Sequence, residues 1–200
     1  MLARFHMHEN FDLLRAIEKL LVRGNLDDAR ALAGGIAAAP DEPGLSQFAV
    51  QATLVRTRAG MLARATRLDD ACRAEARVAD ACAGCHVAAS AAPEFRPPTH
   101  VPPDAPTIEA RMTRHLWATD RLWEGIVGGD QESWQAGLDI LAASPTPEMQ
   151  PTPQRAKLAR RIQQLAAGAR QGNRTDAPAD RATRYGEILV TCASCHASAR

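Results

Sequence analysis

Two short stretches of the chain carry the same pattern of reactive residues. Residues 82–86 read Cys-Ala-Gly-Cys-His and residues 192–196 read Cys-Ala-Ser-Cys-His. C-x-x-C-H is the attachment signature of c-type haem, in which two thiols bond one porphyrin and the histidine binds its iron. On a helix that turns about 100° per residue, the three side chains fall within an arc of about 100° and face one planar ligand. The spacing therefore predicts two haem c groups (iron), held by Cys82, Cys85, Cys192 and Cys195, with His86 and His196 as iron ligands.

A single C-x-x-C pair also occurs in zinc sites and in thioredoxin-like redox proteins. The redox motif belongs to a βαβ unit, whereas both stretches here are flanked by Ala-rich and Arg-rich sequence without a strand pattern. A zinc site needs four ligands close together, and the two motifs are 110 residues apart. Haem attachment is therefore preferred, and a non-haem thiol or zinc protein stays as an alternative.

The composition is compatible with two large apolar cofactors. The chain has 200 residues, of which 46% are hydrophobic but only 4% aromatic, so it has few large side chains for a core. Two porphyrins would supply the missing volume. The formal net charge of +1 argues against a nucleic-acid partner.

The sequence also predicts where in the cell the protein is located. It contains no run of 18 apolar residues, so no membrane span is expected. Charges interrupt the first twenty residues, so no secretory signal is expected there. Because covalent haem attachment normally takes place outside the cytoplasmic membrane, we expect a periplasmic or otherwise exported protein whose export signal was removed or never included.

Apolar residues recur at helical spacing through most of the chain and predict an all-α protein. Four helices are expected before the first motif ends, within residues 5–23, 26–36, 46–67 and 69–86, and four more follow between residues 107 and 196. Gly24 with Asn25, and Gly129 with Asp130, are expected to end one helix and cap the next. Their spacing of 105 residues indicates an internal duplication.

Six of the thirteen prolines lie between Pro93 and Pro106, which predicts an extended connector. We therefore expect a haem domain over residues 1–90, a proline-rich linker over 91–106 and a second haem domain over 107–200. Each domain is expected to be a four-helix bundle with one covalently attached haem c, the two bundles standing in tandem. His100, within the linker, is expected to be solvated.

Each half resembles the cytochrome c′ and cytochrome c556 family, on the two C-x-x-C-H motifs and the four helices before each. The resemblance implies that the haem is buried between the helices, with His86 or His196 as proximal ligand. It also implies that a residue of the first helix of each bundle lies on the distal side.

The distal candidates are few. Met7 and Met112 occupy equivalent positions on the apolar stripes of the two first helices. His115 follows Met112 by three residues and shares its face, while His8 is the rival in the first half. Each methionine is alternatively a core filler.

These residues predict a dihaem c-type cytochrome that carries electrons between redox-partner proteins, rather than an enzyme. The alternatives are a small-gas or redox sensor, a peroxidase-like enzyme using a five-coordinate haem, and a detached module of a larger electron-transfer assembly. The oligomeric state is left open, with a homodimer as one option.

Overall fold

The fold was analysed in a computed structural model, which describes residues 2–91, 93, 95, 100–143, 152–171 and 177–197, with side chains from Met7 onward. Within these residues there are eight α-helices, one 3-10 helix and no strand, which confirms the predicted all-α class. The elements are α1 (Leu2–Val22), α2 (Leu26–Ala37), η1 (Pro43–Phe48), α3 (Ala49–Ala63), α4 (Leu68–Ala88), α5 (Ile108–Val127), α6 (Gln131–Ala143), α7 (Pro153–Gln171) and α8 (Pro178–Ala197). None of the helices in the described ranges combines the length and the apolar character needed to cross a membrane.

The connection between the first two helices of each half has the expected geometry. Gly24 and Gly129 both adopt positive φ values, 73° and 66°, which a residue without a β-carbon adopts at little cost. Asn25 then caps α2 by accepting a hydrogen bond from the backbone N–H of Asp28. The carboxylate of Asp130 accepts hydrogen bonds from two amides in the first turn of α6, at 3.0 and 3.1 Å. In both halves, therefore, the glycine forms the turn after one helix and the following Asn or Asp caps the next helix.

The third helix is shorter than the sequence pattern predicts. It was expected over residues 46–67, whereas α3 covers Ala49–Ala63 and is preceded by the 3-10 turn η1, which has Pro43 at its start. At the other end, the carbonyl of Ala63 accepts a hydrogen bond from Nε of Arg30 on α2, at 3.0 Å. This side-chain donor satisfies a carbonyl of the last turn, so the helix can end there.

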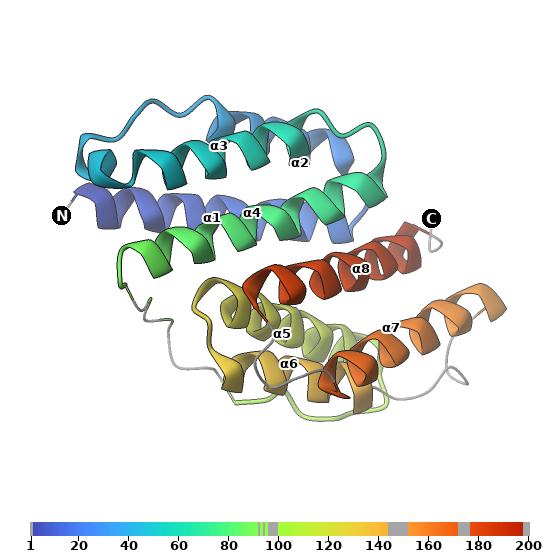
Figure 1. The fold of residues 1–200 in the computed structure, drawn as a ribbon. Helices are drawn as coiled ribbons and strands as arrows, with labels where there is room; N and C mark the ends of the chain where they lie inside the picture. The colour runs from blue at the N-terminus through green and yellow to red at the C-terminus, as the bar shows by residue number, and fades with distance from the viewer. Residues whose placement is uncertain are drawn as a thin grey trace.

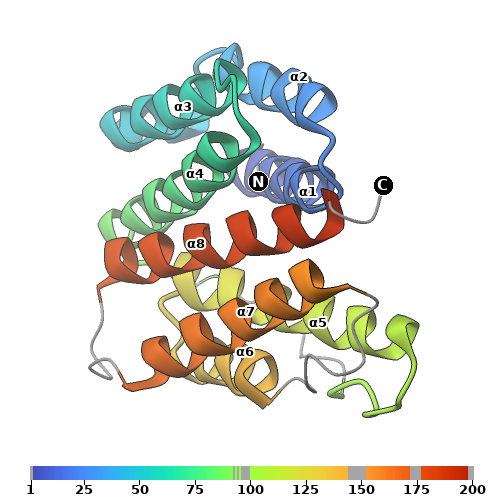
Figure 2. The ribbon, with the colours of Figure 1, turned by 90° about the vertical axis from the view of Figure 1, so that its right-hand side faces the viewer.

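The helices form two sets that meet along α4 and α8. Within each set, neighbours in the chain pack on one another, and α1 also packs on α4, as α5 does on α8. α4 and α8, which carry the two motifs, lie side by side at the centre of the molecule (Figures 1 and 2). α1 also contacts α8, and α4 contacts α5. The buried apolar residues of the two sets form one connected cluster.

Polar and aromatic contacts also join the two sets. The indole Nε1 of Trp123 on α5 donates to Oε1 of Glu75 on α4 at 2.9 Å, and Nε of Arg73 donates to Oε1 of Glu187 on α8 at 2.7 Å. The ring of Phe11 meets Trp123 edge-on, with centroids 5.2 Å apart. The division into residues 1–90 and 107–200 stays a prediction, and the described residues of the 91–106 segment form no helix.

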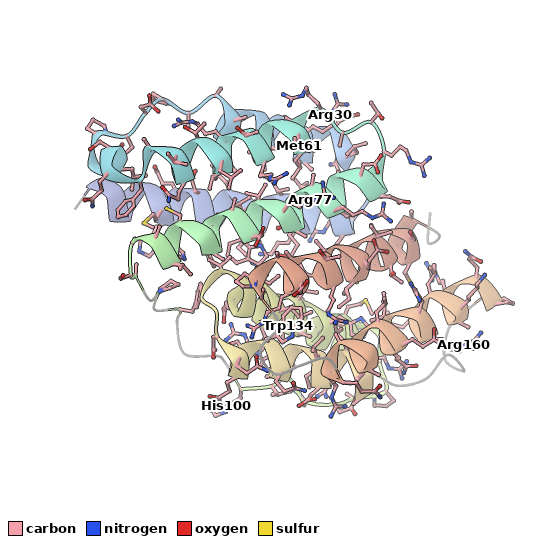
Figure 3. The ribbon with its side chains drawn as sticks, in the orientation of Figure 1. Arg30, Met61, Arg77, His100, Trp134 and Arg160 are labelled. Carbon is pink, nitrogen blue, oxygen red and sulfur yellow. The ribbon has the colours of Figure 1, made fainter. Side chains whose placement is uncertain are left out.

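Two labelled side chains show the contrast between core and surface. Trp134 lies inside the second set of helices and is almost fully buried (Figure 3). His100 lies at the outer edge of the molecule and is exposed, as expected for a solvated residue (Figure 3).

Candidate functional site

The first motif lies in the last two turns of α4 and opens onto a large cavity. Cys82, Cys85 and His86 all line this cavity, which has a volume of about 1190 Å³. Binding sites for drug-sized molecules and cofactors have volumes of roughly 300–1,000 Å³. The three residues that the motif needs therefore face one space that is large enough for a big planar ligand.

The cavity wall comes from both sets of helices. α1 contributes Met7 and His8, and the segment around η1, together with α3, covers another side. α5 contributes Trp123 and Val127, so a helix of the second half closes the site of the first. More than half of the lining residues are apolar, and eight Asp, Glu and Arg residues also line the cavity.

His86 is oriented by a backbone group of that second-half helix. Its Nδ1 lies 3.0 Å from the carbonyl oxygen of Val127. A carbonyl can only accept, so Nδ1 carries the proton and Nε2 keeps its lone pair. This arrangement is the usual one for a metal-binding histidine, because the second hydrogen bond sets both tautomer and ring orientation.

The motif cysteines form no disulfide among the described residues, and their thiols are in the neutral form. Burial raises the pKa of Cys82 to about 12, and burial with the neighbouring Cys195 raises the pKa of Cys192 to about 12. Burial also raises the pKa of Cys85 and of Cys195. A thioredoxin-like redox pair instead needs a lowered thiol pKa, so this environment does not favour thiol redox chemistry.

Both distal candidates of the first half reach the cavity. Met7 is half-buried and His8 is largely exposed, and each lines the same space as His86. The proximal candidate, a thioether and a second imidazole therefore line one cavity.

The second motif lies in the last turns of α8. Cys192 is buried, while Cys195 and His196 are partly buried. On α5, burial lowers the pKa of His115 to about 4, with further lowering from the charges of His196, Arg111 and Arg114. His115 thus lies within electrostatic reach of the proximal candidate. Met112 is half-buried one turn earlier on the same helix.

Sequence reasoning missed the contribution of α5 to the first site. Trp123 of α5 lines the first cavity and donates a hydrogen bond to Glu75 of α4. Glu75 itself went unnoticed because it reads as one charge among many in α4. No local pattern signals either role, since both depend on contact between segments 48 residues apart.

Other reactive side chains are placed as follows. Cys72 is fully buried and forms no disulfide among the described residues, and burial raises the pKa of its thiol. Within the described ranges, no group of three or more His, Cys, Asp or Glu residues is arranged to hold a metal ion by itself.

Comparison with known proteins found no relative of this chain. No family model, no curated protein and no solved structure matches this chain.

Proposed function

We propose that the chain is a dihaem c-type cytochrome that carries electrons between redox-partner proteins. The observation that carries the proposal is the first cavity, where Cys82, Cys85, His86 and Met7 face one space of about 1190 Å³. In this proposal, helices α1–α4 and α5–α8 are two four-helix bundles in tandem. Each bundle holds one haem c at its C-x-x-C-H motif.

The residues of the first cavity fit a haem. Cys82 and Cys85 would hold the porphyrin by thioether bonds, and His86 would bind iron through the Nε2 that its contact with Val127 leaves available. Apolar and aromatic walls, including Phe11 and Trp123, would cover the macrocycle and keep water away. When bound, haem c supplies a one-electron iron couple whose potential depends on its axial ligands and on burial.

The second motif supports the same assignment by its ligand set. Cys192 and Cys195 would hold the second haem and His196 would bind its iron. His115, held neutral by its burial, is available as a distal nitrogen ligand, and Met112 is the alternative sulfur ligand. A neutral imidazole is the form that binds iron.

Electron transfer is favoured over catalysis because each site offers donors for the sixth iron position. A filled sixth position suits electron transfer, whereas a vacant one suits gas binding or peroxide chemistry. Covalent attachment of haem also supports an exported, periplasmic location for the protein.

A second candidate function is a small-gas or redox sensor, or a peroxidase-like enzyme, with a five-coordinate haem. The size of the first cavity favours it, because about 1190 Å³ exceeds the usual range for cofactor sites and leaves room for a small molecule.

Optical spectra of the reduced protein with and without carbon monoxide test the choice. Low-spin bands that carbon monoxide leaves unchanged support electron transfer. A high-spin haem that binds carbon monoxide would move the assignment to sensing or catalysis.

A further inference from the structure

Two carboxyl groups are buried where the two sets of helices meet. Glu18 on α1 is 1% exposed and Glu75 on α4 is 0% exposed. The only described cation close to both is Arg15, which forms ion pairs with Glu18 and with Asp120 of α5. The arginine is therefore already shared between two other carboxylates.

Glu75 has no cation of its own. Its Oε1 accepts a hydrogen bond from the neutral indole of Trp123, and its Oε2 is buried without a hydrogen-bond partner among the described residues. An ionised carboxylate is costly in such a place, whereas a protonated carboxyl is tolerated. Burial, followed by the charge of Glu18, raises the pKa of Glu75 to about 8, although the Trp123 hydrogen bond and Arg15 act against it.

Glu75 lies close to the cavity of the first motif. Cys82 follows it by seven residues, about 10.5 Å along the helix axis, and the charge of Glu75 raises the pKa of the Cys82 thiol. Trp123, which holds Glu75, lines the cavity itself, as does Arg15. Glu75 is fully buried, so water screens little of the effect that a change of charge in the cavity has on it.

The groups that interact electrostatically with Glu75 come from four helices. Arg15 and Glu18 on α1 and Trp123 on α5 act on its pKa. Its own charge raises the pKa of Tyr185 on α8 and of Cys72 and Cys82 on α4.

We propose that Glu75 is a proton site coupled to the redox state of the haem at the first motif. This inference rests on the proposed function. For each electron that a one-electron donor protein delivers there, the Glu75 carboxylate takes one proton from water and forms an O–H bond. On reoxidation the electron leaves to an acceptor and the proton returns to water. The net charge of the buried site is then the same in both states.

Electrostatics determines the direction in which the redox state of the site shifts the pKa of Glu75. The oxidised site carries one more positive charge than the reduced site, so it lowers the pKa of Glu75 relative to the reduced state. Between the two pKa values, one proton accompanies each electron. The coupling therefore works near neutral to mildly alkaline pH, around the pKa of about 8.

The test is a redox titration of the holoprotein from pH 6 to pH 10, after mass spectrometry has counted the covalent haems. We expect the potential of the first haem to fall with rising pH, by up to about 59 mV per pH unit for one proton per electron. Infrared difference spectra should show a protonated carboxyl C=O band in the reduced state. Glu75→Gln keeps an acceptor for Trp123 and should lose both signals. Glu187→Gln, which removes a more exposed carboxylate of α8, should keep them.

Trp123→Phe supplies an independent variant. Loss of its hydrogen bond raises the pKa of Glu75, so the pH-dependent range should move to higher pH. A haem-loaded protein with a pH-independent potential, or a slope that persists in Glu75→Gln, would overturn this inference alone. A purified chain without covalent haem would overturn it together with the proposed function.

Discussion

Gly186 on α8 lies directly against Ala76 on α4: a β-carbon at Gly186 would be 3.4 Å from Cβ of Ala76. Each of these residues stands six positions before the first cysteine of its own motif. Positions at the same distance from the two motifs therefore touch each other where α4 and α8 pack together.

The first prediction concerns this contact. Gly186→Leu adds side-chain volume where Ala76 and the backbone of Arg73 already lie, so it should lower the free energy of unfolding by about 1–3 kcal/mol. Gly186→Ala makes only an ordinary contact and should be neutral, or stabilising by up to about 1 kcal/mol through helix propensity. Denaturant titration of the holoprotein measures both.

Gly168 on α7 is the matched control, because a β-carbon there would meet nothing within 4 Å. Gly168→Leu should not destabilise the protein. If Gly186→Leu and Gly168→Leu unfold at the same denaturant concentration, α4 and α8 are not packed at this position.

The outcome at Gly24 and Gly129 shows what local sequence can predict. A glycine followed by Asn or Asp specifies a turn and a cap within three residues, and both turns form as expected. Helical periodicity puts Met7 on the inner stripe, and Met7 lines the same cavity as Cys82, Cys85 and His86; its role as an iron ligand stays a prediction.

The tertiary contacts could not be predicted from the sequence pattern. The partner of Glu75 is Trp123, 48 residues away, and the acceptor for His86 is the carbonyl of Val127, 41 residues away. The sequence does not indicate which backbone carbonyl will accept a hydrogen bond from a side chain, and it does not distinguish a buried glutamate from an exposed one. Nothing local therefore indicates that α5 closes the first cavity.

The second prediction concerns stability and pH. In the unfolded chain Glu75 titrates near 4.3, an ordinary value, whereas in the folded protein its pKa is about 8. Between these values the folded state holds a proton that the unfolded state has lost, so rising pH favours unfolding. Denaturant unfolding of the wild type and of Glu75→Gln should show that the variant gains stability relative to the wild type from pH 6 to pH 9. Parallel pH profiles would mean that Glu75 is not protonated in the folded protein.

The third prediction concerns the distal side of the first haem. Met7→Ala should remove the weak near-infrared sulfur-to-iron band of that haem and open it to carbon monoxide. The second haem should be unaffected, because its candidate ligands lie on α5 and α8. An unchanged spectrum would make Met7 a packing residue; His8→Ala then shows whether the other cavity-lining candidate binds iron.

The fourth prediction separates the two distal candidates of the second haem. His115 lies within electrostatic reach of His196, so His115→Ala should raise the potential of the second haem or open it to carbon monoxide. Met112→Ala, one turn earlier, is the control and should leave the low-spin spectrum in place. The reverse pattern would assign the ligand to Met112.

The central claim is that both C-x-x-C-H motifs carry covalent haem, and the most direct measurement is the mass of the intact chain. The chain should be made in a host that matures c-type cytochromes and extracted with acid and acetone before mass spectrometry. We predict the mass of the polypeptide plus two haem groups, and plus one in a Cys82→Ala/Cys85→Ala variant. A wild-type chain that carries one haem, or none, would contradict the account.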